Sequence, residues 1–217
     1  MDPNVGLAIQ CVGIVLITVL TFFMRTSIRN ASLNYWLIAW ACLAVSLCSL
    51  FIGFQVSGLQ NVFYSIYFLG EYGFGLMFIA GCRYYSTGKL VRRSDAYFLI
   101  GALAVALALP FLSADFNDLF TVQAFILALL LGAAVFNLRP AVTGKEASQG
   151  LSVMRVALML LTIDFLHYVP MFSFRKGLWG IWVPLEYLKY TSIFDLLLEI
   201  LLGFGTVMVA PRCGVRW

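Results

Sequence analysis

Seven long apolar runs follow one another along the chain, separated by short polar breaks. Each run is close to the roughly 20 residues that a helix needs to cross the hydrocarbon core of a bilayer. The strands of a membrane β-barrel would alternate in polarity over about ten residues, whereas these runs are continuously apolar and rich in Leu, Ala and Phe. The pattern therefore predicts seven transmembrane helices. They cover residues 5–24, 35–54, 61–82, 96–113, 119–138, 151–172 and 183–209.

The composition also indicates a membrane protein. Hydrophobic residues make up 62% of the 217 residues and charged residues only 11%, and the mean hydropathy is +0.95. A soluble domain carries about 25% charged residues. The longest polar connections, RYYSTGKLVRRSD and RPAVTGKEASQG, are too short to hold a soluble domain. We therefore expect residues 1–217 to form a single all-α transmembrane domain, a seven-helix bundle surrounded by membrane lipids.

Basic residues gather in alternate connections between the runs. Ten of them follow the first, third, fifth and seventh runs, and two lie in the opposite connections. The ten are Arg25, Arg29, Arg83, Lys89, Arg92, Arg93, Arg139, Lys145, Arg212 and Arg216, and the two are Arg175 and Lys176. Because short cytoplasmic loops retain Lys and Arg, the N-terminus is predicted outside and the C-terminus in the cytoplasm. The formal charge of +4 fits attraction to anionic headgroups, so we expect no nucleic-acid partner.

Motifs for enzyme chemistry are few. His167 is the only histidine, so no site built from several histidines is predicted. The five cysteines show no paired metal-ligand spacing, and no serine lies in a nucleophile elbow. A mixed zinc site of His167, Asp164 and a carboxylate from elsewhere in the chain is chemically allowed as an alternative. The sequence otherwise predicts no catalytic residue and no metal site, and it identifies no cofactor.

Ionisable residues inside the apolar runs point to a site. Each costs roughly 2.5 to 3.5 kcal/mol in hydrocarbon, so such residues suggest a function or a partner. Glu71 lies in the third run, Asp164 and His167 in the sixth, and Glu186 and Lys189 in the seventh. The last four form two i, i+3 pairs, and the helical rise of about 1.5 Å per residue places both pairs in the outer half of the membrane. We expect these residues to line a polar ligand pocket. The alternative is a neutralised buried pair that only fixes helix packing.

Two further carboxyl groups and a proline complete the polar set. Asp195 and Glu199 lie deeper in the seventh run and are spaced i, i+4, so they share one helix face. They form a candidate proton relay, with packing and one retained proton as the alternative. Pro170 frees the backbone carbonyl of Leu166 and permits a kink, which we expect to shape the mouth of the pocket.

Four segments together resemble the N-terminal multi-helix membrane modules of bacterial sensor histidine kinases and diguanylate cyclases. They are LNYWLIAWACLAVSLCSL, YFLGEYGFGLMFIAGCRYY, DFLHYVPMF and YTSIFDLLLEILLGFGTVMV. The resemblance implies a sensor in the bacterial inner membrane, as in two-component signal transduction. It also implies a cytoplasmic output domain or partner after GFGTVMV, and it admits a homodimer.

Three functions compete at this point. The leading one is a sensory or receptor module for signal transduction that binds an unidentified small ligand in the outer-half pocket and shifts the seventh helix. The second is a small-solute or proton-coupled transporter that uses the carboxyl groups of Glu71, Asp164 and Glu199. The third is a retinal protein, because Lys189 is the only lysine inside a predicted helix and Glu71 offers a counter-ion. No catalytic activity is expected in any of the three.

Overall fold

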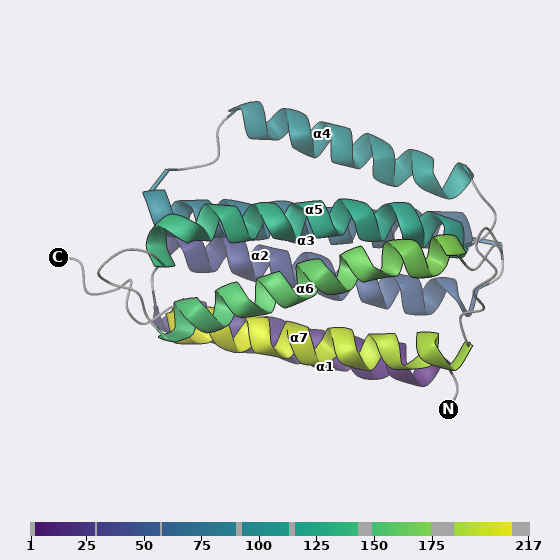
Figure 1. Ribbon diagram of the computed structural model, residues 1–217, viewed down its shortest axis with the longest axis horizontal. Helices are drawn as coiled ribbons and strands as arrows, with labels where there is room; N and C mark the ends of the chain where they lie inside the picture. The colour runs from purple at the N-terminus through teal and green to yellow at the C-terminus, as the bar shows by residue number, and fades with distance from the viewer. Residues whose placement is uncertain are drawn as a thin grey trace.

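The computed structural model describes the backbone of residues 3–28, 30–56, 58–89, 93–112, 116–142, 149–174 and 185–209. Every element in these ranges is helical (Figure 1). The elements are α1 (Pro3–Ser27), α2 (Ala31–Gly53), α3 (Gln60–Thr87), α4 (Arg93–Ala108), the short 3-10 helix η1 (Leu109–Phe111), α5 (Phe116–Val142), α6 (Gln149–Phe174) and α7 (Leu185–Val209). The prediction of an all-α chain is confirmed for this part of the protein.

Five of these helices are long and apolar enough to cross a membrane within the described residues. They are Val5–Ser27, Ala31–Gly53, Gln60–Thr87, Leu119–Leu138 and Gln149–Ser173. A shorter apolar stretch covers Ile100–Phe111. Large apolar side chains also cover the outside of the bundle; Leu16, Phe136 and Phe204 are each more than half exposed. Such a surface suits a lipid environment. The seven-span count and the orientation stay predictions.

Several helix ends are set by capping, glycine and proline residues rather than by hydropathy. Asn30 precedes α2 and its side chain accepts a hydrogen bond from the Ser32 N–H at 3.0 Å. The third helix extends five residues beyond its expected end at residue 82 and stops before Gly88, which has the left-handed φ of 66° that glycine tolerates. The fourth α-helix ends at Ala108 rather than near 113, because a 3-10 turn containing Pro110 follows it.

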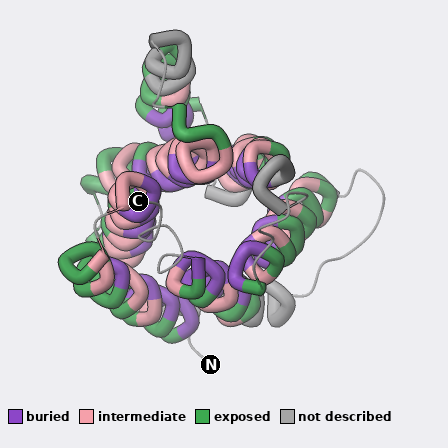
Figure 2. Tube along the Cα trace, turned by 90° about the vertical axis from the view of Figure 1, so that its left-hand side faces the viewer, coloured by how far each residue is buried: buried purple, intermediate pink, exposed green. Residues whose placement is uncertain are grey.

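Six of the helices form a closed ring in the order α1, α2, α3, α5, α6 and α7, and α7 returns to contact α1. The two helices that close the ring begin at the same end of the bundle and run in the same direction (Figure 1). In contrast, α4 stands apart from the ring, packed mainly against α3 and next to η1 (Figures 1 and 2). The ring therefore brings α3 and α5 together although α4 separates them in sequence.

The contact between α2 and α3 is the most extensive in the ring. Trp36 and Trp40 are fully buried there, and their rings pack against Phe78 at centroid distances of 6.2 Å. A glycine, Gly70, brings the two backbones close, because a Cβ at this position would lie 2.7 Å from the Cys42 carbonyl oxygen. This tight pair supports the inner face of α3, where the first of the interior carboxyl groups lies.

Candidate functional site

Four carboxyl groups gather at the helix contacts of the ring. Glu71 on α3 and Asp195 and Glu199 on α7 are buried, with exposed fractions of 3%, 8% and 4%. Asp164 on α6 is half-buried. Carboxyl groups almost never lie so deep in a protein without a hydrogen-bond partner. Each of the four has a polar side-chain contact, which comes from a neighbouring helix for Glu71, Asp195 and Glu199 and from Tyr168 of the same helix for Asp164.

Tyr168 joins α6 to α7. Its hydroxyl oxygen lies 2.8 Å from Oδ1 of Asp195 and 3.3 Å from Oδ2 of Asp164. A tyrosine hydroxyl has one proton to donate, so the shorter contact to Asp195 is the stronger hydrogen bond. The carboxyl groups of Asp164 and Asp195 therefore meet at the same hydroxyl oxygen.

Gln10 joins α1 to α7. Its side-chain Nε2 donates to both carboxylate oxygens of Glu199, at 3.1 and 3.3 Å. Both residues are buried. Sequence reasoning missed Gln10, because it concentrated on charged residues and an amide carries no charge. The available signal was a strongly polar side chain inside a long apolar run, which in a membrane also needs a partner.

Ser46 joins α2 to α3. The hydroxyl oxygen of this fully buried serine lies 2.7 Å from the Tyr67 backbone carbonyl oxygen and 3.4 Å from Oε1 of Glu71. The single hydroxyl proton therefore goes to the carbonyl, and the contact with Glu71 is the weaker one. Glu71 thus has a polar neighbour from α2.

We call these linked residues the interior polar layer. Its members are Gln10, Ser46, Glu71, Asp164, Tyr168, Asp195 and Glu199. None of these members lies on α5, but a further polar residue, Gln123, lies on that helix. Gln123 is fully buried, and neither of its amide atoms has a hydrogen-bond partner among the described residues. Gln123 lies one helical turn after Phe120. The ring centroids of Phe120 and Tyr168 are 5.7 Å apart.

No lysine or arginine neutralises the layer among the residues whose side chains the structure describes. The carboxyl groups of the layer contact a glutamine, a serine and a tyrosine. In the same residues, no three His, Cys, Asp or Glu side chains could together hold a metal ion. The layer therefore consists of three separate polar groups, one each at the contacts of α1 with α7, α2 with α3 and α6 with α7.

The sequence-predicted site residues are divided by the structure. Asp164 and Glu71 belong to the interior polar layer together with the candidate relay residues Asp195 and Glu199. His167 is exposed on α6, as is Pro170, and α6 stays helical through this proline to Phe174.

The backbone of α7 includes Glu186 and Lys189, but their side chains lie outside the described residues. The predicted outer-half pocket of Asp164, His167, Glu186 and Lys189 therefore stays a prediction. What the sequence did not anticipate is the pairing of Asp164 with the deeper Asp195, which Tyr168 mediates.

Comparison of the chain with protein-family models, with curated proteins and with solved structures found no match. The functional argument therefore rests on the geometry of the interior polar layer.

Proposed function

We propose that this chain is a multi-pass membrane sensory module of the bacterial plasma membrane, and that its interior polar layer receives the signal. The observation that carries the proposal is a set of four carboxyl groups that have no basic partner among the described side chains and that meet polar side chains at three helix contacts, α1 with α7, α2 with α3 and α6 with α7. An unpaired negative charge inside a membrane protein is costly, and such residues commonly mark ion or proton pathways and ligand sites. The layer therefore favours a signal that brings positive charge, either a proton or a small cationic solute.

The layer offers a direct route from that signal to α7. Asp195 and Glu199 contribute the α7 side of two of its links, one to Tyr168 of α6 and one to Gln10 of α1. Added positive charge changes the acceptor strength of these carboxyl groups and hence the hydrogen bonds that hold α7 against its neighbours. A ligand shifts an equilibrium between two arrangements only if it interacts differently with each. The linked carboxyl groups supply that difference, and α7 is the helix after which the resemblance places an output domain.

A distance measurement in nanodiscs tests this proposal. Spin labels carried by non-canonical amino acids at Thr26 of α1 and Met208 of α7 report how the ends of these neighbouring helices lie. We expect the distance distribution to change on titration from pH 8 to about pH 5 or on addition of tetramethylammonium, which distinguishes a proton from an organic cation. The response should disappear in the double variant Asp195→Asn with Glu199→Gln. The variant Ser173→Ala, at an exposed position of α6 outside the layer, serves as the control and should respond like the wild type.

A proton-coupled carrier is the second candidate, because the same interior carboxyl groups could pass a proton between them. The two functions differ in net transport. Protein reconstituted in liposomes that contain a pH-sensitive dye should show no proton flux above protein-free liposomes if the chain is a sensor. Flux that is lost in the Asp195→Asn and Glu199→Gln double variant would favour the carrier and contradict the sensor proposal.

A further inference from the structure

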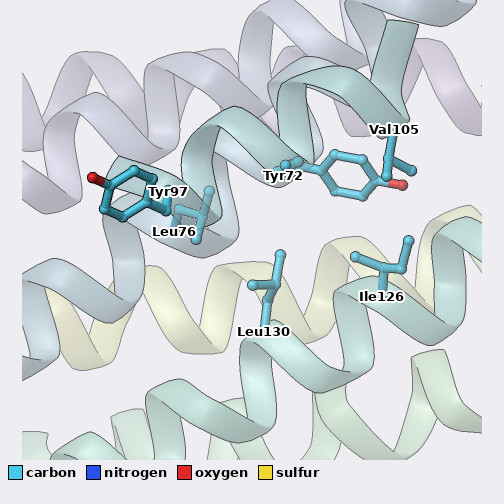
Figure 3. A pocket seen from close by; sticks show the side chains of 8 residues that line it. Tyr72, Leu76, Tyr97, Val105, Ile126 and Leu130 are labelled. Atoms are coloured by element: carbon cyan, nitrogen blue, oxygen red, sulfur yellow. The ribbon is translucent and has the colours of Figure 1, made fainter. Parts of the chain in front are cut away.

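A second site lies outside the ring, between α3, α4 and α5. It is a pocket of about 410 Å³ (Figure 3). This volume is in the range of small-molecule sites, roughly 300 to 1,000 Å³. Its walls include Tyr72 and Leu76 of α3, Gly101 and Val105 of α4, and Ile126 and Leu130 of α5. These side chains are almost entirely apolar, and none of them carries a charge.

The pocket exists because α4 does not join the ring. A Cβ added at Gly101 would meet no atom within 4 Å, so the α4 backbone stands away from its neighbours at this position. Val105 is 37% exposed and lies at the same wall, so the pocket opens at the surface of the bundle. Since α3 and α5 are apolar and of membrane-spanning length and α4 adds the shorter apolar stretch Ile100–Phe111, we expect that surface to face lipid. A molecule dissolved in the bilayer can therefore reach the pocket without crossing water.

Tyr72 gives the pocket a buried hydroxyl group in its inner wall, whereas the other hydroxyl of the lining belongs to Tyr97 of α4, which is 76% exposed. Its side chain is 1% exposed, and its hydroxyl group has no hydrogen-bond partner among the described residues. In Figure 3 the ring extends along the pocket with its hydroxyl toward Val105. A buried hydroxyl group without a partner loses the hydrogen bonds that water would give it, which is unfavourable. An acceptor brought by a ligand would restore one of them.

We propose that this pocket binds an uncharged, membrane-soluble molecule with an apolar body and one acceptor oxygen, which receives a hydrogen bond from Tyr72. The apolar walls match the body of such a molecule, and the described lining residues include no charged group that would bind an ionic headgroup. The site stands apart from the interior polar layer, because Glu71 and Tyr72 are consecutive on α3 and point about 100° apart around the helix. The proposal does not depend on the sensory function.

Benzophenone is a suitable probe, because it is uncharged, apolar and carries a single carbonyl acceptor. On irradiation this carbonyl inserts into a nearby C–H bond, so the labelled residues can be mapped by mass spectrometry of the purified protein in nanodiscs. We expect saturable labelling at Leu76, Val105, Ile126 and Leu130. Labelling spread over lipid-facing side chains such as Phe22 and Phe136, without saturation, would overturn the proposal.

Two variants separate the volume of the pocket from its hydrogen bond. Gly101→Leu fills open space and should abolish labelling of α3 and α5, whereas Ala104→Leu adds the same bulk at an α4 position outside the lining and should leave the labelling unchanged. Tyr72→Phe should raise the benzophenone concentration at half-saturation by about 2- to 10-fold, which is the effect of losing one neutral hydrogen bond. Equal labelling of Gly101→Leu and Ala104→Leu would show that the pocket is not the site. Unchanged half-saturation in Tyr72→Phe would mean that the pocket takes any acyl chain, and would also overturn the proposal.

Discussion

Tyr168 places one hydroxyl group between two carboxyl groups on adjacent helices. The residue is 1% exposed, and its oxygen contacts both Asp195 and Asp164. Removing the hydroxyl leaves the buried carboxyl group of Asp195 without this donor, and the cost of an unsatisfied buried group exceeds the net gain from an ordinary hydrogen bond. The side chain therefore contributes to stability mainly by satisfying its neighbours.

Tyr168→Phe should lower the free energy of unfolding by about 1 to 3 kcal/mol, because it removes the donor without changing the packing of the ring. Unfolding of the purified protein in mixed micelles measures this difference. Tyr97→Phe removes a hydroxyl from a side chain that is 76% exposed and should change the stability little. Equal effects of the two changes would mean that the hydroxyl of Tyr168 stabilises nothing.

The pair of Gln10 and Glu199 predicts non-additive behaviour. Gln10→Leu alone strands the Glu199 carboxyl group and should destabilise the protein by about 1.5 to 3 kcal/mol, as expected for a hydrogen bond to a charged group. Combining it with Glu199→Leu removes both polar groups and should recover much of that loss. A double-mutant cycle in the same unfolding assay measures the coupling. Strict additivity of the two single effects would show that the contact contributes no pairwise stability.

Glycines decide how closely two of the helix pairs approach. At Gly70 of α3, an added Cβ would lie 2.7 Å from both the Cys42 carbonyl oxygen and the Ser46 Cβ. At Gly205 of α7, it would lie 2.7 Å from the Met154 Cα on α6. Small residues at such contacts are typical of membrane helices, which gain stability from close packing because lipid offers no hydrophobic drive between them. The contact at Gly70 includes Ser46, a member of the interior polar layer. The contact at Gly205 lies between α6 and α7, the two helices that Tyr168 and Asp195 also join.

Gly70→Ala should destabilise the contact of α2 with α3 by about 1 to 3 kcal/mol, the usual cost of overpacking. The matched control is Gly101→Ala, because that Cβ enters open space and alanine favours a helix over glycine by up to about 1 kcal/mol. The two variants should therefore change the unfolding free energy in opposite directions. Destabilisation of similar size in both would contradict the close approach at Gly70.

Across the whole bundle, six helices close a ring and leave α4 outside. This arrangement gives the protein two different environments. The ring contacts enclose hydrogen-bonded carboxyl groups, and the space between the ring and α4 forms an apolar pocket. On α3, Glu71 belongs to the interior polar layer and the next residue, Tyr72, lines the pocket. This helix is therefore shared by both candidate sites.

The predicted orientation gives a test of the complete chain. Because ten basic residues lie in alternate connections against two in the others, reporter fusions after Arg93 and after Arg216 should both report the cytoplasm. A fusion within ADFND, residues 114–118, should report the exterior. An external signal from the fusion after Arg216 would contradict a map with seven spans.

The sequence alone was sufficient to predict the all-helical fold and the approximate position of each α-helix in the described part of the chain, five of which are long and apolar enough to cross a membrane. Length and hydropathy are local properties, and a run of about 20 apolar residues has few other structures open to it in a bilayer. The sequence also contains local signals for individual helix ends, such as the cap at Asn30 before α2 and the turn at Pro110 after α4. Even the carboxyl groups of the interior polar layer stood out, because charged residues are rare in apolar runs.

Only the tertiary structure decided which helices meet and which polar side chains pair. Helices that face lipid on one side and protein on the other are apolar on both, so their sequences carry little of the amphipathic pattern that indicates the buried face of a soluble helix. Spacing placed Asp195 and Glu199 on one face of α7, yet Tyr168 and Gln10 became their partners because α6 and α1 pack on that helix from two sides. The exclusion of α4 from the ring, and with it the pocket beside Tyr72, likewise depends on contacts between helices that lie far apart in the sequence.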